Sequence, residues 1–152
     1  MHWIWGGTFT KYALMGADGT FLKQKKIPSP LSSLEDLLSA VKAIGEEFDG
    51  QYEGAAVSMP GRIDMREGIA HTGGSFRFIK NTPVGKYFEE ILHVPVTAAN
   101  DGKCAANAEA WNGALADVDN GAVLVIGTGI GGGIVLNGKV WMGNTFGAGE
   151  LS

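Results

Sequence analysis

The stretch GAVLVIGTGIGGGIVLNGKVWM, residues 121–142, combines apolar runs with glycine turns. Its apolar run 121–126 predicts a strand, and Gly127-Thr128-Gly129 then predicts a turn. Residues 134–136 predict a second strand, and 139–142 a third. Asn137-Gly138 between them is a strong signal for a two-residue β-hairpin turn. The stretch therefore predicts strand, glycine turn, strand, hairpin turn and strand.

The start of the chain repeats this order. A short strand leads into Gly6-Gly7-Thr8, residues 8–16 alternate as a strand does, and Asp18-Gly19 predicts a turn before a returning strand at 20–27. We interpret the two units as an internal duplication whose second copy has barely begun when the chain stops. Two such lobes would face each other across a cleft.

The residues between the two units alternate helices and strands. Ser32 and Glu35 match a capping box, and the apolar spacing behind them predicts a helix that stops near Gly50. A buried strand at 54–59, a helix at 84–92, a strand at 94–100 and a helix from Asp101 to about Trp111 follow. This order indicates an α/β layered sheet. We expect a first lobe at 1–117 and the beginning of a second at 118–152.

The glycine turn at Gly127, Gly129 and Gly132 formally matches the dinucleotide-binding fingerprint. That fingerprint needs a helix after the glycines, whereas a strand, a turn and a strand follow here, so the match is misleading. A glycine turn between strands can instead present backbone N–H groups to a phosphate. Thr8 and Thr128 would add hydroxyl donors. The alternative is a pair of tight hairpins that bind nothing.

Two carboxylates are candidates for chemistry. Asn100-Asp101 ends a buried strand, where open α/β sheets place their ligands, and an aspartate there could take a proton from a substrate hydroxyl during phosphoryl transfer. Its alternative role is that of a helix N-cap. Glu150 lies in a glycine-rich segment, and its alternative is an ordinary exposed glutamate. The four tryptophans favour core positions, with sugar stacking left open for Trp141.

Composition excludes several classes of protein. The formal net charge of −4 over 152 residues gives no electrostatic footprint for nucleic acid or a membrane surface, and the basic cluster at 23–26 is best interpreted as a solvated strand face. No apolar run approaches the roughly 20 residues that span a bilayer. Three scattered histidines show no metal-ligand spacing. The single cysteine, Cys104, fits a reducing compartment. The N-terminal residues do not have the pattern of a secretory signal, so we expect a cytoplasmic protein.

These motifs together resemble the ROK family of the actin-like kinase superfamily, in the family's order and over essentially the whole chain. Gly6-Gly7-Thr8 with Lys11 is similar to the first phosphate loop, and Ser58-Met59-Pro60-Gly61 to the loop after the fourth strand. Asn100-Asp101 resembles the pair that binds sugar and acts as general base. Residues 127–133 are similar to the second phosphate loop, and 147–150 to the start of the family signature.

The resemblance implies a ribonuclease H-like, actin-like ATPase lobe with a mixed five-stranded sheet and flanking helices, followed by the first hairpin of a truncated second lobe. It implies an ATP- and Mg²⁺-dependent kinase that phosphorylates a hexose-type sugar, and a homo-oligomer in the full-length protein. Asp101 would be the base. The implied sugar-binding residues are Asn100, Glu150, Gly74 and Ser75; the implied phosphate-binding residues are Gly6, Gly7, Thr8, Lys11, Gly127, Thr128, Gly129 and Gly131.

The chain departs from the family pattern in two places. Ile4 stands where the family has the aspartate that helps to position the metal, and Leu151-Ser152 follow Glu150 in place of the residue-Gly-His continuation that precedes a zinc site in many members. We expect a fragment with little kinase activity alone and a sheet edge that invites self-association. Two alternatives are the sugar-sensing body of a ROK transcriptional regulator, which a helix-turn-helix upstream would indicate, and a binding module without catalysis.

Overall fold

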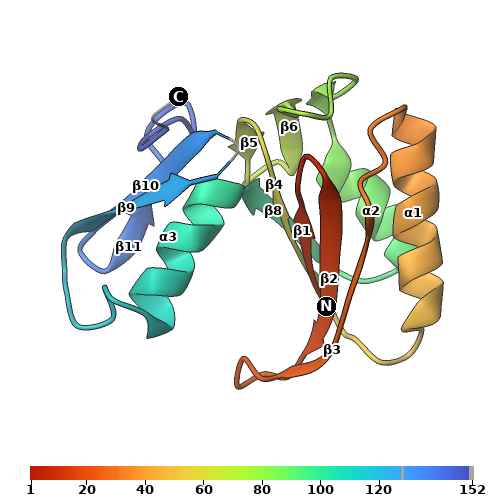
Figure 1. Ribbon diagram of the computed structural model, residues 1–152, viewed down its shortest axis with the longest axis horizontal. Helices are drawn as coiled ribbons and strands as arrows, with labels where there is room; N and C mark the ends of the chain where they lie inside the picture. Colours follow the sequence, from red (N-terminus) through yellow and green to blue (C-terminus); the bar gives the residue numbers. More distant parts are fainter. Residues whose placement is uncertain (128, 151–152) are drawn as a thin grey trace. The chain divides into compact units, whose positions relative to one another are not determined.

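The computed structural model describes residues 1–127 and 129–150 (Figure 1). The chain forms two compact units, Met1–Ala98 and the residues from Ala99 onward. The contacts thus group the helix that follows Asn100 with the glycine-rich hairpin. The boundary expected between residues 117 and 118 concerns the lobes of a complete protein and stays a prediction.

The first unit is built on a sheet whose strand order is β3-β2-β1-β4-β8. The strands β1 (His2–Trp5), β2 (Phe9–Met15) and β3 (Phe21–Pro28) pair antiparallel, whereas β4 (Ala55–Met59) runs parallel to β1. The last strand is β8 (Val96–Asn100). The mixed five-stranded sheet expected from the sequence is confirmed.

Two helices cover one face of this sheet, α1 (Leu34–Glu47) and α2 (Val84–Leu92) (Figure 1). The predicted capping box is wrong by one residue, because the N-cap is Ser33, whose hydroxyl accepts from the Asp36 amide at 3.1 Å. Alternation along β1 turns Trp3 and Trp5 toward the helices. Both are buried, in a core completed from helices, strands and their connections by Leu37, Val41, Ile44, Phe48, Val57, Phe76 and Phe88.

A small second sheet in this unit was not predicted. It consists of β5 (Ile63–Asp64), β6 (Ile69–Thr72) and β7 (Lys80–Thr82) in antiparallel order. These strands are too short for a period-two pattern to stand out from a loop. The turn between β5 and β6 is held by Asp64, whose carboxylate accepts from the amides of Arg66 and Glu67.

The second unit contains α3 (Asp101–Asn112) and a three-stranded antiparallel sheet of order β11-β10-β9. The strands are β9 (Gly121–Ile126), β10 (Ile130–Leu136) and β11 (Lys139–Trp141). The hairpin turn at Asn137-Gly138 is confirmed, since both residues have positive φ. β10 begins at Ile130, earlier than the predicted 134, because Gly131 to Gly133 pair with β9.

One face of the β9–β11 sheet packs against α3, and the other exposes large apolar side chains, among them Leu124, Ile126, Ile130 and Trp141. The prediction of core positions is therefore right for Trp3 and Trp5 and wrong for Trp111 and Trp141, which are 61% and 52% exposed. In the described part of the chain, no helix has the length and apolar character needed to cross a membrane.

Trp5→Phe is expected to leave stability nearly unchanged. Trp5 is 1% exposed, and its indole Nε1 has no hydrogen-bond partner in the described part of the chain. A buried unpaired donor costs about 1–3 kcal/mol, which offsets the packing lost with the smaller ring. Urea unfolding followed by circular dichroism should give a change within about 1 kcal/mol. Leu37→Ala, a buried aliphatic control, should lose about 2–5 kcal/mol; equal losses in the two variants would contradict the prediction.

Candidate functional site

The first glycine turn joins β1 to β2. The Gly6 amide donates to the Phe9 carbonyl at 3.2 Å. Ser29, the residue after β3, fixes the same turn, because its hydroxyl donates to the Gly6 carbonyl at 2.6 Å and its amide to the Thr8 carbonyl at 3.1 Å. Sequence reasoning missed Ser29; its position between Pro28 and Pro30, where β3 ends, is the signal that could have indicated it.

The structure brings Gly7, Gly74 and Ser75 together. A methyl group at Gly7 would lie 2.9 Å from the Ser75 hydroxyl oxygen, and one at Gly74 would lie 2.8 Å from Cβ of Pro60. Gly74 also has φ +56°, in the region that favours glycine. Three motifs singled out in the sequence therefore meet within the first unit: the first glycine turn, the Pro60-Gly61 turn and the Gly73-Gly74-Ser75 segment.

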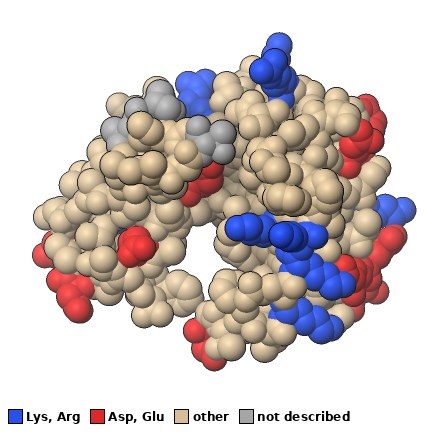
Figure 2. All heavy atoms as spheres, in the orientation of Figure 1, with Lys and Arg blue, Asp and Glu red and all other residues tan. Residues whose placement is uncertain are grey.

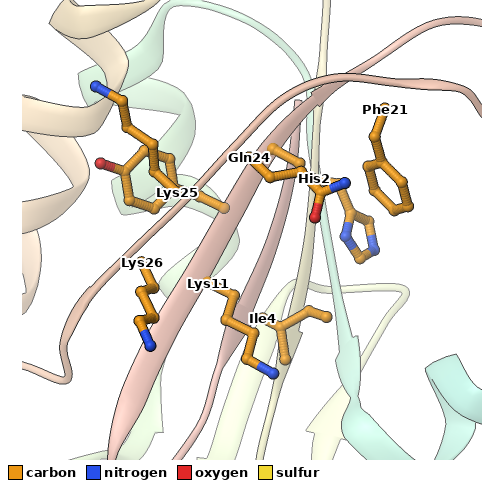
Figure 3. Close-up of a pocket in the computed structure, with 9 residues that line it drawn as sticks. His2, Ile4, Lys11, Phe21, Gln24, Lys25 and Lys26 are labelled. Atoms are coloured by element: carbon orange, nitrogen blue, oxygen red, sulfur yellow. The ribbon is translucent and has the colours of Figure 1, made fainter.

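Lys11 lies in β2, with its side chain on the sheet face opposite the helices. It is paired with Ile4 on one side and Lys26 on the other, and it lines a cavity of about 420 Å³ with His2, Phe21 and Gln24 (Figure 3). Burial, and then the N-terminal charge, lower the pKa of His2. Figure 2 shows a run of Lys and Arg side chains near the middle of the view and others apart from it, at the top and at the right edge.

The side chain at position 4 does not fit a magnesium ion. Ile4 offers a hydrocarbon, whereas Mg²⁺ is held by oxygen ligands. Among residues 1–127 and 129–150, no group of three or more His, Cys, Asp or Glu side chains could hold a metal. Ile4 is therefore not a metal ligand.

In the second unit, Asn100 and Asp101 have different positions at the start of α3: Asn100 caps the helix and Asp101 is its first residue. Asn100 is the N-cap of α3, 3% exposed, and its side-chain oxygen accepts from the Lys103 amide at 3.1 Å. The alternative in which Asp101 caps the helix is therefore wrong. Asp101 is the first helical residue and is exposed, with one carboxylate oxygen accepting from the Gly102 amide at 2.9 Å. A carboxylate at this position is favoured by the helix dipole.

Close approaches at four glycines bring together α3, β10 and the segment that carries Glu150. A methyl group at Gly102 would lie 2.7 Å from backbone atoms of Gly132, and one at Gly133 would lie 2.5 Å from Cβ of Ala106. A methyl group at Gly149 would lie 2.9 Å from Cα of Gly133. We call these four residues (Gly102, Gly132, Gly133 and Gly149) the glycine stack. It places the residues next to Asp101 and Glu150 against the same strand.

Lys103 belongs to this region, and sequence reasoning missed it. It is 2% exposed, and its Nζ lies 3.5 Å from the Gly132 carbonyl oxygen. Burial lowers the pKa of Lys103, while the charges of Glu150 and then Asp101 act in the opposite direction. The signal in the sequence is a lysine inside the first turn of an alanine-rich helix, two residues after the candidate base.

The second glycine turn is shorter than predicted. The Gly127 amide donates to the Gly129 carbonyl at 2.9 Å, and both residues are exposed. Gly131 is not in the turn, since it pairs with Val125 inside the sheet. Thr128, predicted to bind phosphate, lies outside the described residues. Of the predicted phosphate-binding residues here, Gly127 and Gly129 therefore form the turn and Gly131 a strand.

The first unit has a mixed sheet, with a glycine turn after β1 and a Pro-Gly turn after β4. This architecture is that of an actin-like ATPase-type α/β protein. The sequence model of the ROK family matches residues 4–151. The chain belongs to the ROK family. It is 35% identical over 147 residues to a β-glucoside kinase of Listeria monocytogenes, an alignment that covers 96% of this chain and 49% of that protein.

Solved structures agree with this assignment. The Lmo2764 protein of Listeria monocytogenes superposes with a TM-score of 0.91 at 34% identity, covering 98% of this chain and 51% of that one. A ROK family transcriptional regulator, a homologue of the E. coli MLC protein, gives a TM-score of 0.88 at 30% identity over 98% of this chain and 39% of that one. The chain spans about half the length of the curated relatives it matches.

Proposed function

We propose that this chain is the sugar-binding portion of a ROK sugar kinase, whose whole form transfers the γ-phosphoryl group of ATP to a hydroxyl of a hexose-type sugar. The observation that supports this most is the glycine stack. It holds the N-terminal turn of α3 and the segment that carries Glu150 against strand β10. Two carboxylates and a buried amide then belong to one compact unit. The kinase relatives, of which this chain spans half, supply the reaction class.

In this proposal Asp101 is the general base. Its carboxylate takes the proton of the sugar hydroxyl while that oxygen forms a bond to the γ-phosphorus and ADP leaves. Asp101 is suited to the role because it is exposed and its neighbour Asn100 does the capping. Asn100 and Glu150 would bind sugar hydroxyls, as would Gly74 and Ser75.

The two glycine turns would bind the phosphates of ATP through backbone N–H groups. The first would contribute Gly6, Gly7 and Thr8, the second Gly127 and Gly129, and they would stabilise charge without covalent chemistry. Lys11 would add a positive charge from the sheet. The reaction would also require Mg²⁺, which the nucleotide and residues other than Ile4 would hold. We further propose a cytoplasmic protein that forms a homo-oligomer when complete.

A second candidate function is the sugar-sensing body of a regulator. The similarity to the regulator homologous to the MLC protein favours it, as does the isoleucine at position 4. Both functions require sugar binding, and only the kinase requires Asp101 to take a proton. Sugar affinity therefore tests the shared part of the proposal, and phosphoryl transfer separates the two.

Glu150→Gln is expected to weaken sugar binding by the chain about 10- to 100-fold, because a hydrogen bond from a hydroxyl to a carboxylate contributes about 1.5–3 kcal/mol. Isothermal titration calorimetry with glucose, cellobiose, N-acetylglucosamine and N-acetylmannosamine measures the affinities. Glu90→Gln, an exposed glutamate of α2, is the matched control and should leave them unchanged. Absence of binding by the unaltered chain at millimolar concentrations of every sugar would overturn the proposed function.

A further inference from the structure

Lys103 is a buried lysine. It is 2% exposed and lies in the first turn of α3, where its backbone amide is bound by Asn100. Its ammonium group has three donors, and the acceptor at the Gly132 carbonyl is 3.5 Å away, at the long limit for a hydrogen bond. Burying an ammonium is costly unless nearby charges stabilise it.

The nearby charges are the two candidate carboxylates. Glu150 and then Asp101 favour the protonated form of Lys103, against the effect of burial. After Ala98 the sequence has no arginine and one other lysine, Lys139, which is exposed in β11. Within the second unit, Lys103 is therefore the buried cation on which the charges of both Glu150 and Asp101 act.

The segment 143–150, which carries Glu150, has an irregular backbone. Its backbone bonds run from the Ala148 amide to the Met142 carbonyl at 3.3 Å and from the Glu150 amide to the Gly147 carbonyl at 3.2 Å. Gly143 and Gly149 have φ of +68° and +73°, so the backbone bends at both ends of the segment. Gly149 approaches Gly133 of β10, next to the strand residue whose carbonyl Lys103 reaches.

We infer that Lys103 is a positioning residue, whose buried ammonium binds the Gly132 carbonyl and holds the Glu150 segment beside Asp101 by charge. This inference rests on the proposed function in its claim that the positioned carboxylates receive a sugar. The geometry itself concerns only residues of the second unit. In this arrangement the glycine stack brings the backbones together, and the charge of Lys103 holds the Glu150 segment in place.

A double-mutant cycle tests the coupling. Lys103→Met keeps an unbranched side chain, one heavy atom shorter, and removes the charge. As a single change it is expected to weaken sugar binding at least 10-fold. In a Glu150→Gln background the same change should weaken it less than 3-fold, because the charge to be held is gone. Fully additive losses would overturn the inference.

Amide hydrogen exchange provides a readout that does not depend on sugar. Exchange in segment 143–150 should be at least fivefold faster in Lys103→Met, with α1 unchanged as the internal control. Glu150→Gln, a change at an exposed residue, should accelerate the same segment, so the inference stays testable if Lys103→Met fails to fold. Faster exchange throughout α3 and β10, or an unchanged segment in Glu150→Gln, would indicate a merely structural lysine and overturn it.

Sugar affinity and amide exchange together distinguish failure of the proposed function from failure of the inference about Lys103. If the chain binds no sugar but the exchange results are as expected, the proposed function fails and the positioning role stands. If sugar binds and Glu150→Gln weakens it while neither the cycle nor the exchange shows coupling to Lys103, the function stands and this inference fails.

Discussion

Asp101→Asn is expected to lower phosphoryl transfer to sugar by about 10²- to 10⁴-fold, the usual contribution of a positioned general base. Asparagine keeps the size of the side chain and can still accept from the Gly102 amide, as Asp101 does at 2.9 Å. It cannot take the proton of the attacking hydroxyl. The turnover number should therefore fall, while sugar affinity changes little.

The measurement requires a protein with both halves of the kinase. We suggest joining residues 1–150 to the second half of the Listeria monocytogenes β-glucoside kinase, with Ile4→Asp in the background to restore the usual loop residue. ADP release and sugar affinity are then measured for each variant. Asp117→Asn, which neutralises an exposed carboxylate beyond α3, is the matched control. Equal turnover in Asp101→Asn and Asp117→Asn would show that Asp101 is not the base.

Gly133→Ala is expected to destabilise the second unit by about 1–3 kcal/mol, the usual cost of forcing extra atoms into a packed interior. The added methyl group would lie 2.5 Å from Cβ of Ala106 and 3.2 Å from the Gly102 carbonyl oxygen. Neither neighbour is the flexible end of a long side chain. Helix α3 and strand β10 would have to separate, which would also displace Asp101 from the Glu150 segment.

Gly131→Ala is the matched control on the same strand, because nothing lies within 4 Å of a methyl group at Gly131. Its stability should stay within about 0.5 kcal/mol of the unaltered chain, as for surface substitutions in general. Urea unfolding measured by circular dichroism, with sugar affinity as a second readout, compares the two variants. Equal stability of both would mean that the backbone contact in the glycine stack does not hold the unit together.

Much of the fold could be predicted because its signals are local. The bounds of α2 at 84–92 and of β9 at 121–126 match the predicted ranges, and the Asn137-Gly138 hairpin is where the dipeptide indicates. Apolar spacing and turn residues act over a few positions of the chain, so they can be recognised in one sequence. The capping residue of α1 was misplaced because adjacent serines, 32 and 33, carry nearly the same signal.

The site could be predicted only in outline. Asn100, Asp101 and Glu150 follow from motifs, but which of the first two caps α3 depends on the conformation that the strand end adopts. Ser29 and Lys103 were missed because their contacts join residues far apart in the chain: Ser29 with Gly6, and Lys103 with Gly132. No local pattern carries such information.

The order of helices and strands, the repeated glycine hairpin and the membership of the ROK family can be recognised in the sequence, because they depend on residue type and spacing along the chain. The role of each glycine is visible only in the folded chain. Gly127 and Gly129 form a turn, whereas Gly102, Gly132, Gly133 and Gly149 form a contact between backbones. The difference is steric. The atom that excludes a Cβ at Gly102, Gly133 or Gly149 belongs to a residue on another element, far along the chain, so it can be identified only when the chain has folded.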